Sequence, residues 1–195
     1  MPGVDLYWIP LGADGNPVVR RSGRLYEALA ARREHRSPRP LFHSALMVDM
    51  GAGERWAIEM APVWSTVAPE RGVVAEGAVG RPWLGRSRLF RYEVRCWRNG
   101  SIPDLDAAVG KPVHFDVSTA QARALVEQAR SFPTFTWGLD ELGADDMWNS
   151  NSLVSWLLVT SGLPAASLRP PDSGRAPGWQ AGLVAAHHPP EPFAA

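Results

Sequence analysis

Residues 148–160 read Trp148-Asn149-Ser150-Asn151-Ser152-Leu153-Val154-Ser155-Trp156-Leu157-Leu158-Val159-Thr160. From Ser152 onward this segment is apolar on almost every side when it is wound as a helix. Gly162 and Pro164 follow it and form a strong helix stop. A helix without a polar face must be buried, so the segment predicts a central helix surrounded by the rest of a globular domain.

The polar run Asn149-Ser150-Asn151-Ser152 at the start of this helix has two interpretations. Asn and Ser are preferred N-cap residues, so the run is explained by redundant capping alone. A serine at a helix N-terminus also meets unsatisfied N–H groups and the positive end of the helix dipole, which favour developing negative charge. On this second interpretation Ser150 is a candidate nucleophile, and Asn149 helps the helix N–H groups to hold an oxyanion.

The rest of the chain predicts an antiparallel sheet packed against helices. Strands are predicted from β-branched, aromatic or alternating residues at Val4–Ile9, Leu41–Met50, Arg55–Met60, Ser87–Trp97 and Lys111–Phe115. The second and third form a hairpin around residues 51–53. In the fourth, every second residue from Leu89 or Phe90 is expected to face the core, and the Arg and Glu residues to face water.

Two further helices are predicted from capping residues. Ser22 caps a helix that ends near Arg33, and Ser118 caps a helix that Pro133 terminates. Residues 62–82 are rich in Gly and Pro and show weak periodicity, so no element is predicted there. We therefore expect an α+β fold.

Length and composition predict one α+β domain over residues 1–168, because 195 residues suffice for one substantial core. Residues 169–195 are expected to be a Pro/Gly-rich C-terminal segment with a mobile tail that includes His187 and His188. These two histidines are adjacent and lack the helical spacing of a metal pair. We expect no metal and no cofactor, since the glycines of residues 72–85 also lack the Lys-Ser/Thr ending of a phosphate-binding loop.

Charge and cysteine content exclude several classes of protein. Twenty basic and twenty acidic residues leave no net charge, so nucleic acid is not a favoured partner. Cys96 is the single cysteine, which rules out an internal disulfide, and its place in an amphipathic strand predicts a small core residue. The chain has neither a signal-like N-terminus nor an apolar run long enough for a membrane span, so we expect a cytoplasmic protein unless a specialised system secretes it.

A nucleophilic serine needs a base, and His43 is the first candidate because it lies near the start of a predicted central strand. His114, in the predicted edge strand, is the second. Glu59 lies in the other strand of the hairpin, where a carboxylate would orient the imidazole. Both also have simpler explanations, namely a hydrogen-bonded strand histidine for His43 and a solvent-facing strand residue for Glu59.

The order of these residues resembles that of the circularly permuted papain-like superfamily, which includes permuted NlpC/P60 peptidases, lecithin:retinol acyltransferase-like proteins and PPPDE peptidases. In that pattern a histidine comes first, and a cysteine follows an Asn at the start of a buried helix. Here His43 matches the histidine and Ser150 stands where the cysteine would be, with Glu59 as a weaker match to the third polar residue. The segment also resembles a group of bacterial proteins in which an Asn-Ser-Asn-Ser run precedes a helix and a Pro-Gly-Trp motif follows, here Pro177-Gly178-Trp179.

The resemblance implies a hydrolase or acyltransferase that acts on an amide or ester bond through Ser150, His43 and Glu59. It implies no particular substrate, and peptide, peptidoglycan and lipid all remain open. One alternative is an inactive binding module that uses the same cleft, because serine is a poorer nucleophile than a thiolate. Another is a structural or partner-binding protein. The residues expected to contact a ligand are Trp148, Asn151 and Ser152 beside the nucleophile, and Trp64 and Trp83 as flat apolar surfaces.

Overall fold

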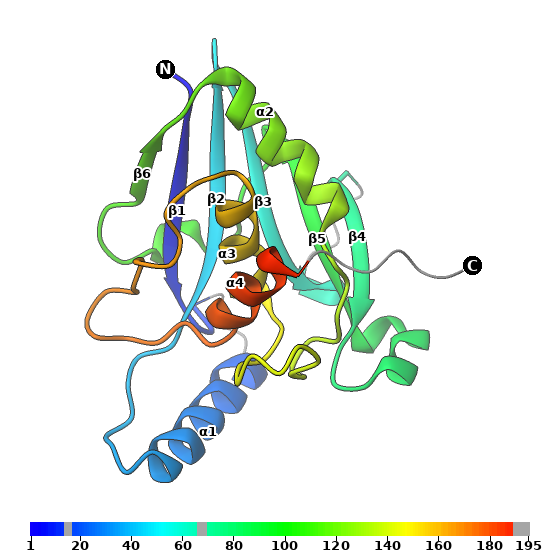
Figure 1. The fold of residues 1–195 in the computed structure, drawn as a ribbon. Helices are drawn as coiled ribbons and strands as arrows, with labels where there is room; N and C mark the ends of the chain where they lie inside the picture. The colour runs from blue at the N-terminus through cyan, green and yellow to red at the C-terminus, as the bar shows by residue number, and fades with distance from the viewer. Residues whose placement is uncertain (14–16, 66–69, 189–195) are drawn as a thin grey trace.

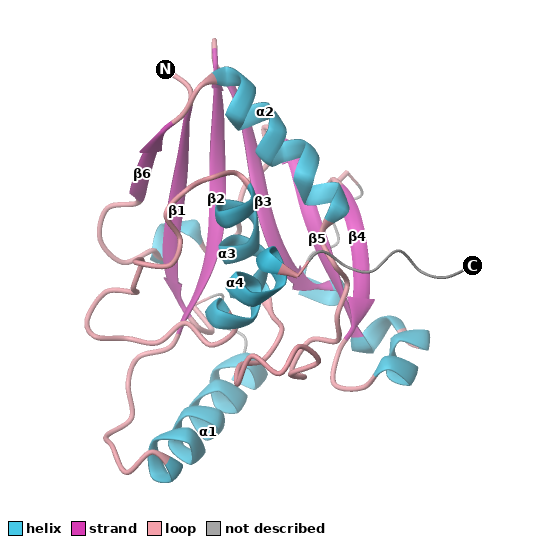
Figure 2. Cartoon of the chain, viewed as in Figure 1, coloured by secondary structure: helices cyan, strands magenta, loops and turns pink. Residues whose placement is uncertain are grey.

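The computed structural model describes residues 1–13, 17–65 and 70–188, with only the backbone of Pro17 and Val18. Over these residues the fold is α+β, with one six-stranded antiparallel sheet and four α-helices (Figures 1 and 2). The predicted class, an antiparallel sheet packed against helices, is therefore confirmed. The predicted tail from residue 189 onward lies outside the described residues.

The sheet has the strand order β4-β5-β3-β2-β1-β6, and every neighbouring pair is antiparallel. The predicted hairpin is confirmed as β2 and β3, which turn at residues 51–53 with positive φ throughout. The predicted edge strand is also confirmed, since β6 pairs with β1 at one margin of the sheet. The strands are β1 (Gly3–Pro10), β2 (Phe42–Gly51), β3 (Glu54–Pro62), β4 (Val73–Ala78), β5 (Arg91–Arg98) and β6 (Val113–Asp116).

Three of the four helices cover one face of the sheet. Figure 1 shows α2, α3 and α4 in front of the strands, whereas α1 lies beyond the strand ends. The core forms between the sheet and α3, where Leu153, Val154, Leu157 and Leu158 are fully buried. Each such side chain stabilises the fold by about 1.5–3 kcal/mol. The helices are α1 (Pro17–Arg33), α2 (Thr119–Gln128), α3 (Ser150–Thr160) and α4 (Trp179–His187).

The central helix is confirmed and two helix boundaries are corrected. The helix predicted to start at Ser22 begins at Pro17, and the Ser22 hydroxyl donates to Val19 O within it (3.0 Å). Proline is favoured at a first helical position because its missing N–H is not needed there. The cap predicted at Ser118 is confirmed as a capping box with Gln121, but α2 ends at Gln128, before Pro133.

The best predicted strand is shorter than expected and is buried on both faces. It begins at Arg91, because residues 88–90 form a 3-10 helix. Tyr92, Val94 and Cys96 face the main core, as predicted. The prediction that the alternating charged residues face water is wrong for Glu93 and Arg95, which are both fully buried.

Two elements lie where none is predicted. Strand β4 forms within the Gly/Pro-rich region, with Gly77 so close to the Tyr92 ring that a Cβ would lie 2.3 Å from it. Helix α4 forms within the C-terminal segment and packs against α3. Gly182 permits this approach, since a Cβ there would lie 2.1 Å from Ser155 Oγ. Residues up to 188 thus include a helix that helps to enclose the core.

Candidate functional site

The polar side chains at the start of α3 dock the segment that leads into α4. Asn149 and Asn151 both donate from Nδ2 to Pro177 O, each at 2.8 Å. Ser152 Oγ donates to Gly178 O at 2.7 Å, and Ser155 Oγ donates to Trp179 O at 2.8 Å. Three consecutive carbonyls of the Pro-Gly-Trp motif are therefore satisfied by α3 side chains.

The same side chains complete the cap of α3 and fasten it to the sheet. Asn149 Oδ1 accepts from Asn151 N, and Ser152 Oγ accepts from Asn149 N, which together form a capping box. Asn151 also donates to Phe42 O (3.0 Å) and accepts from the Ser44 hydroxyl (2.8 Å) on β2. Redundant capping, the simpler interpretation, thus accounts for Asn149, Asn151 and Ser152.

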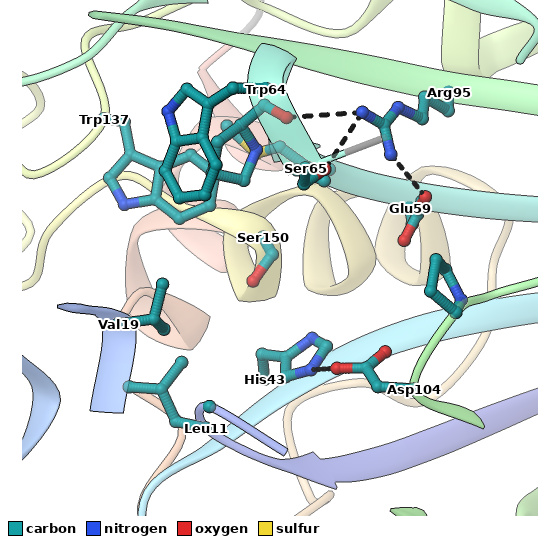
Figure 3. Close-up of a pocket in the computed structure, with 15 residues that line it drawn as sticks. Leu11, Val19, His43, Glu59, Trp64, Ser65, Arg95, Asp104, Trp137 and Ser150 are labelled. Atoms are coloured by element: carbon teal, nitrogen blue, oxygen red, sulfur yellow. Dashed lines mark hydrogen bonds and ion pairs between the residues drawn. The ribbon is translucent and has the colours of Figure 1, made fainter. Parts of the chain in front are cut away.

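Ser150 is the member of the run that this network does not use. Its hydroxyl makes no hydrogen bond with any described residue, and neither does its backbone N–H. The residue is 5% exposed, and the exposed part lines a pocket next to His43. Figure 3 shows the Ser150 side chain at the start of α3 pointing into this pocket. Its hydroxyl is available to a ligand.

His43 lies on β2 and shares a hydrogen bond with Asp104, with 2.8 Å between Nε2 and Oδ2. Burial alone would raise the pKa of Asp104, but the hydrogen bond and charge of His43 outweigh it and lower that pKa. Since Nε2 is held by the carboxylate, Nδ1 is the ring nitrogen left for another partner. His43 and Ser150 line the same pocket but share no hydrogen bond in this structure.

Glu59 makes no hydrogen bond with His43, so the prediction that it orients the imidazole is corrected: Asp104 is the acid bound to the ring. Glu59 lies directly opposite Arg95 in the β3–β5 register, and its Oε1 accepts from Arg95 Nη1 at 2.9 Å. Arg95 also binds Glu93 (3.2 Å), which in turn binds Arg71. Burial raises the pKa of Glu59 despite the adjacent guanidinium.

Two connected cavities meet at Ser150 and His43. The smaller has a volume of about 130 Å³, and its lining includes Glu59, Arg95 and Asp104. The larger is a groove of about 620 Å³ whose lining includes Asn149 and Asn151. Trp64 lines both cavities, as the sequence predicts for a cleft residue, and so does Trp137, which the sequence does not single out.

Several predicted site residues lie elsewhere. Trp148, predicted to bind substrate, is buried between the rings of Phe132 and Phe135, at centroid distances of 4.9 and 5.0 Å. Ser152 is also fully buried and is not among the residues that line the two cavities. The backbone of Trp148 is fixed by hydrogen bonds with Gly138 (2.8 Å) and Leu139 (2.9 Å).

The remaining candidates also fall away from the pocket. Trp83 is exposed but lines neither cavity. His114, the second candidate base, binds Asp5 on the β6 edge of the sheet (2.6 Å). Cys96 is buried, and burial raises the pKa of its thiol to about 11, so it is not a reactive thiolate at neutral pH.

Asp104 is the site residue that the sequence does not reveal. It follows Ile102-Pro103 in an irregular segment, 61 positions from His43. A single acid after a proline is typical of a turn, so no local pattern distinguishes it. Only the fold brings it beside β2.

Two other features are absent from the described part of the chain. No three His, Cys, Asp or Glu side chains there are grouped to hold a metal ion. No helix in the same residues has the length and apolar character needed to cross a membrane.

The chain was also compared with known proteins. Protein-family models, curated proteins and solved structures were searched, and none of the three comparisons found a match.

Proposed function

We propose that the protein is a serine-nucleophile hydrolase or acyltransferase that acts on an amide or ester bond. The observation that carries the proposal is the position of the Ser150 hydroxyl. Among the polar side chains of residues 149–152, it alone makes no hydrogen bond with a described residue. It faces a pocket beside His43, and the Nε2 atom of His43 is hydrogen-bonded to Asp104. Nucleophile, base and orienting acid are the three parts that acyl transfer needs.

The chemistry follows from these three side chains. Ser150 Oγ attacks the substrate carbonyl carbon while His43 Nδ1 takes the hydroxyl proton. Asp104 accepts from Nε2–H and stabilises the imidazolium that forms. His43 then gives the proton to the leaving nitrogen or oxygen, the bond to the leaving group breaks, and the acyl group remains on Ser150 until water or another acceptor takes it.

Backbone groups at the start of α3 are the best oxyanion donors. Asn149, the residue predicted for this role, uses Oδ1 on Asn151 N and Nδ2 on Pro177 O. The Ser150 N–H has no described partner and lies at the positive end of the α3 dipole. A donor in this position stabilises negative charge on the carbonyl oxygen as the tetrahedral intermediate forms.

The mechanism requires Ser150 Oγ to reach His43 Nδ1 during the reaction. Catalytic hydrogen bonds are often long before substrate binds, and they tighten in the complex. A rotation of the serine χ1 angle moves only its hydroxyl, which no hydrogen bond to the described residues restrains. The proposal therefore requires that substrate binding in the pocket brings the two atoms into contact.

The permuted papain-like relationship is part of the proposal. It is supported by a histidine on an early sheet strand, by a later buried helix that begins with the candidate nucleophile, and by the packing of that helix against β2 and β3. Asp104 replaces Glu59 as the polar third residue.

A fluorophosphonate probe tests the function, because it reacts covalently with activated serines. We expect labelling of the wild-type protein, with the adduct located on Ser150 by mass spectrometry. Labelling should be lost in Ser150→Ala and His43→Ala and kept in Ser167→Ala, a matched control at an exposed serine. Absence of labelling in folded wild-type protein would contradict the proposal.

A binding module without turnover is the second candidate, and one observation favours it. The Ser150 and His43 side chains share no hydrogen bond. An unlabelled protein that still binds a ligand saturably in the pocket would establish this alternative.

A further inference from the structure

Ser150 and His43 line two neighbouring cavities, of which the smaller has acidic side chains in its lining and the larger has none among the described residues. The groove of about 620 Å³ and the pocket of about 130 Å³ share these two residues and both tryptophans, Trp64 and Trp137. The volume of the groove falls within the range of small-molecule sites. A substrate whose reactive carbonyl is at Ser150 would therefore extend into both cavities, and the lining of each restricts what it holds.

The groove has an apolar lining. None of the described residues that line it is Asp, Glu, Lys or Arg, although such residues make up 21% of the chain. Trp64, Leu89 and Phe90 in its wall are 44%, 64% and 38% exposed, which is unusual for large apolar side chains without a partner. A ligand charge placed here would lose water without gaining a counter-charge, whereas an apolar chain would bury these side chains.

The small pocket is also largely apolar, but unlike the groove it has charged side chains in its lining, namely Glu59, Arg95 and Asp104. The Glu59 side chain is 8% exposed, and its Oε2 makes no hydrogen bond with a described residue. Figure 3 shows this oxygen on the side of the carboxyl that faces away from Arg95, above the His43–Asp104 pair. Arg95 itself donates to Glu59, Glu93, the Pro62 carbonyl and the Ser65 hydroxyl.

These acceptors determine which group fits the small pocket. Glu59 and Asp104 place two carboxylates in its lining, against the single guanidinium of Arg95, which is already paired with Glu59 and Glu93. A hydroxyl or ammonium group can donate to Glu59 Oε2, whereas a carboxylate or phosphate would be repelled.

We infer that the substrate is an amphipathic acyl compound, with an uncharged apolar acyl chain in the groove and a small hydroxyl- or amine-bearing head against Glu59. This inference rests on the proposed function and gives its substrate class. Attack by Ser150 would form the ester of the acyl chain on Oγ, and the bond to the head would break. His43 would deliver the serine proton to the head, which leaves through the small pocket as an alcohol or amine.

Binding to the Ser150→Ala variant tests the inference without turnover. Three probes distinguish the contribution of the acyl chain from that of the head. The fluorescence of Trp64 and Trp137 in the cavity walls reports binding. We expect N-dodecanoylethanolamine to bind at least about a hundredfold tighter than N-acetylethanolamine, which has the same head without the chain. It should bind about tenfold tighter than methyl dodecanoate, which has the chain without a donor.

Two variants in the Ser150→Ala background locate each contact. Leu89→Asp puts a charge in the groove wall and should weaken N-dodecanoylethanolamine binding at least about tenfold. Leu25→Asp is the matched control, because Leu25 is also 63% exposed but lines neither cavity. Glu59→Gln should bring the affinities for N-dodecanoylethanolamine and methyl dodecanoate close together, and thermal unfolding checks that each variant is folded.

Equal effects of Leu89→Asp and Leu25→Asp, or equal binding of the acetyl and dodecanoyl probes, would overturn the inference. These outcomes are independent of the serine chemistry. A protein labelled on Ser150 that shows no preference for the long chain would refute the substrate class alone. A protein that binds the chain but is never labelled would refute the hydrolase or acyltransferase function alone.

Discussion

At the scale of single residues, the Asp104 carboxylate is expected to position His43. Asp104→Asn keeps the shape of the side chain but removes the charge that holds Nε2–H, so Nδ1 is no longer presented as the base. We expect the rate of fluorophosphonate labelling to fall about a hundredfold or more. An unchanged rate would mean that Asp104 only packs beside His43.

The same substitution has a stability signature with a defined pH window. His43 lowers the pKa of Asp104 below its ordinary value of 3.8, so the carboxylate stabilises the native state above that value. This contribution is lost as the pH falls through the lowered native pKa. The difference in unfolding free energy between wild type and Asp104→Asn should therefore shrink as the pH falls from about 5 to about 3. Denaturant titrations across this range measure it.

The residues of the site were unequally predictable. Ser150 and His43 stand in local patterns, a polar helix start and a strand start, that the sequence displays directly. The position of Asp104 beside His43 depends on the path of residues 99–112 through the fold. These residues show no helical or strand periodicity in the sequence. Glu59 is a reasonable sequence choice because it lies in the hairpin with His43, but β5 pairs with β3 across a gap in chain order and brings Arg95 opposite it.

At the scale of elements, β5 is the strand whose environment differs most from its pattern. Its alternating Glu93 and Arg95 are typical of a solvent face, yet both side chains are buried in an ion-pair chain that joins Arg71 to Glu59. A sequence pattern records alternation but does not show that both faces of a strand are covered. Strand β4 and the 3-10 turn at residues 63–65, which complete that cover, are not predictable from their irregular composition.

These buried ion pairs predict that two arginines of β5 contribute very differently to the free energy of unfolding. Arg95→Met leaves Glu59 and Glu93 buried without their shared cation, and should cost about 3–5 kcal/mol of unfolding free energy. Arg98→Met is the control on the same strand, because Arg98 is 63% exposed and its pair with Glu54 should contribute less than about 1 kcal/mol. Urea unfolding measures both. A similar loss in the two variants would show that the buried pairs do not stabilise the sheet.

At the scale of the whole molecule, three segments far apart in sequence meet at the start of α3. Asn151 bonds to β2 on one side and to Pro177 on the other, so the candidate nucleophile is fixed between the sheet and the segment leading to α4. The buried α3 helix and the hairpin are predictable because their signals are local. Helix α4 is not, because its short apolar sequence acquires a position only when Gly178 and Gly182 let it approach α3.

Gly178 therefore matters to the assembly of the whole site. It has φ of +90°, and a Cβ there would lie 2.2 Å from Asn149 Oδ1, the acceptor that caps α3. Gly110 is a matched control, since its φ is +74° but a Cβ there would have no atom within 4 Å. Replacing Gly110 with Ala should cost about 1–2 kcal/mol from backbone strain. Gly178→Ala should cost about 1–3 kcal/mol more because it also displaces a packed side chain. Thermal and urea unfolding compare the two variants, and fluorophosphonate labelling of the folded Gly178→Ala protein should be slower, because the displaced Asn149 cap no longer holds Ser150 in place. Equal stability and equal labelling in both variants would show that the close approach of Gly178 to Asn149 does not support the candidate site.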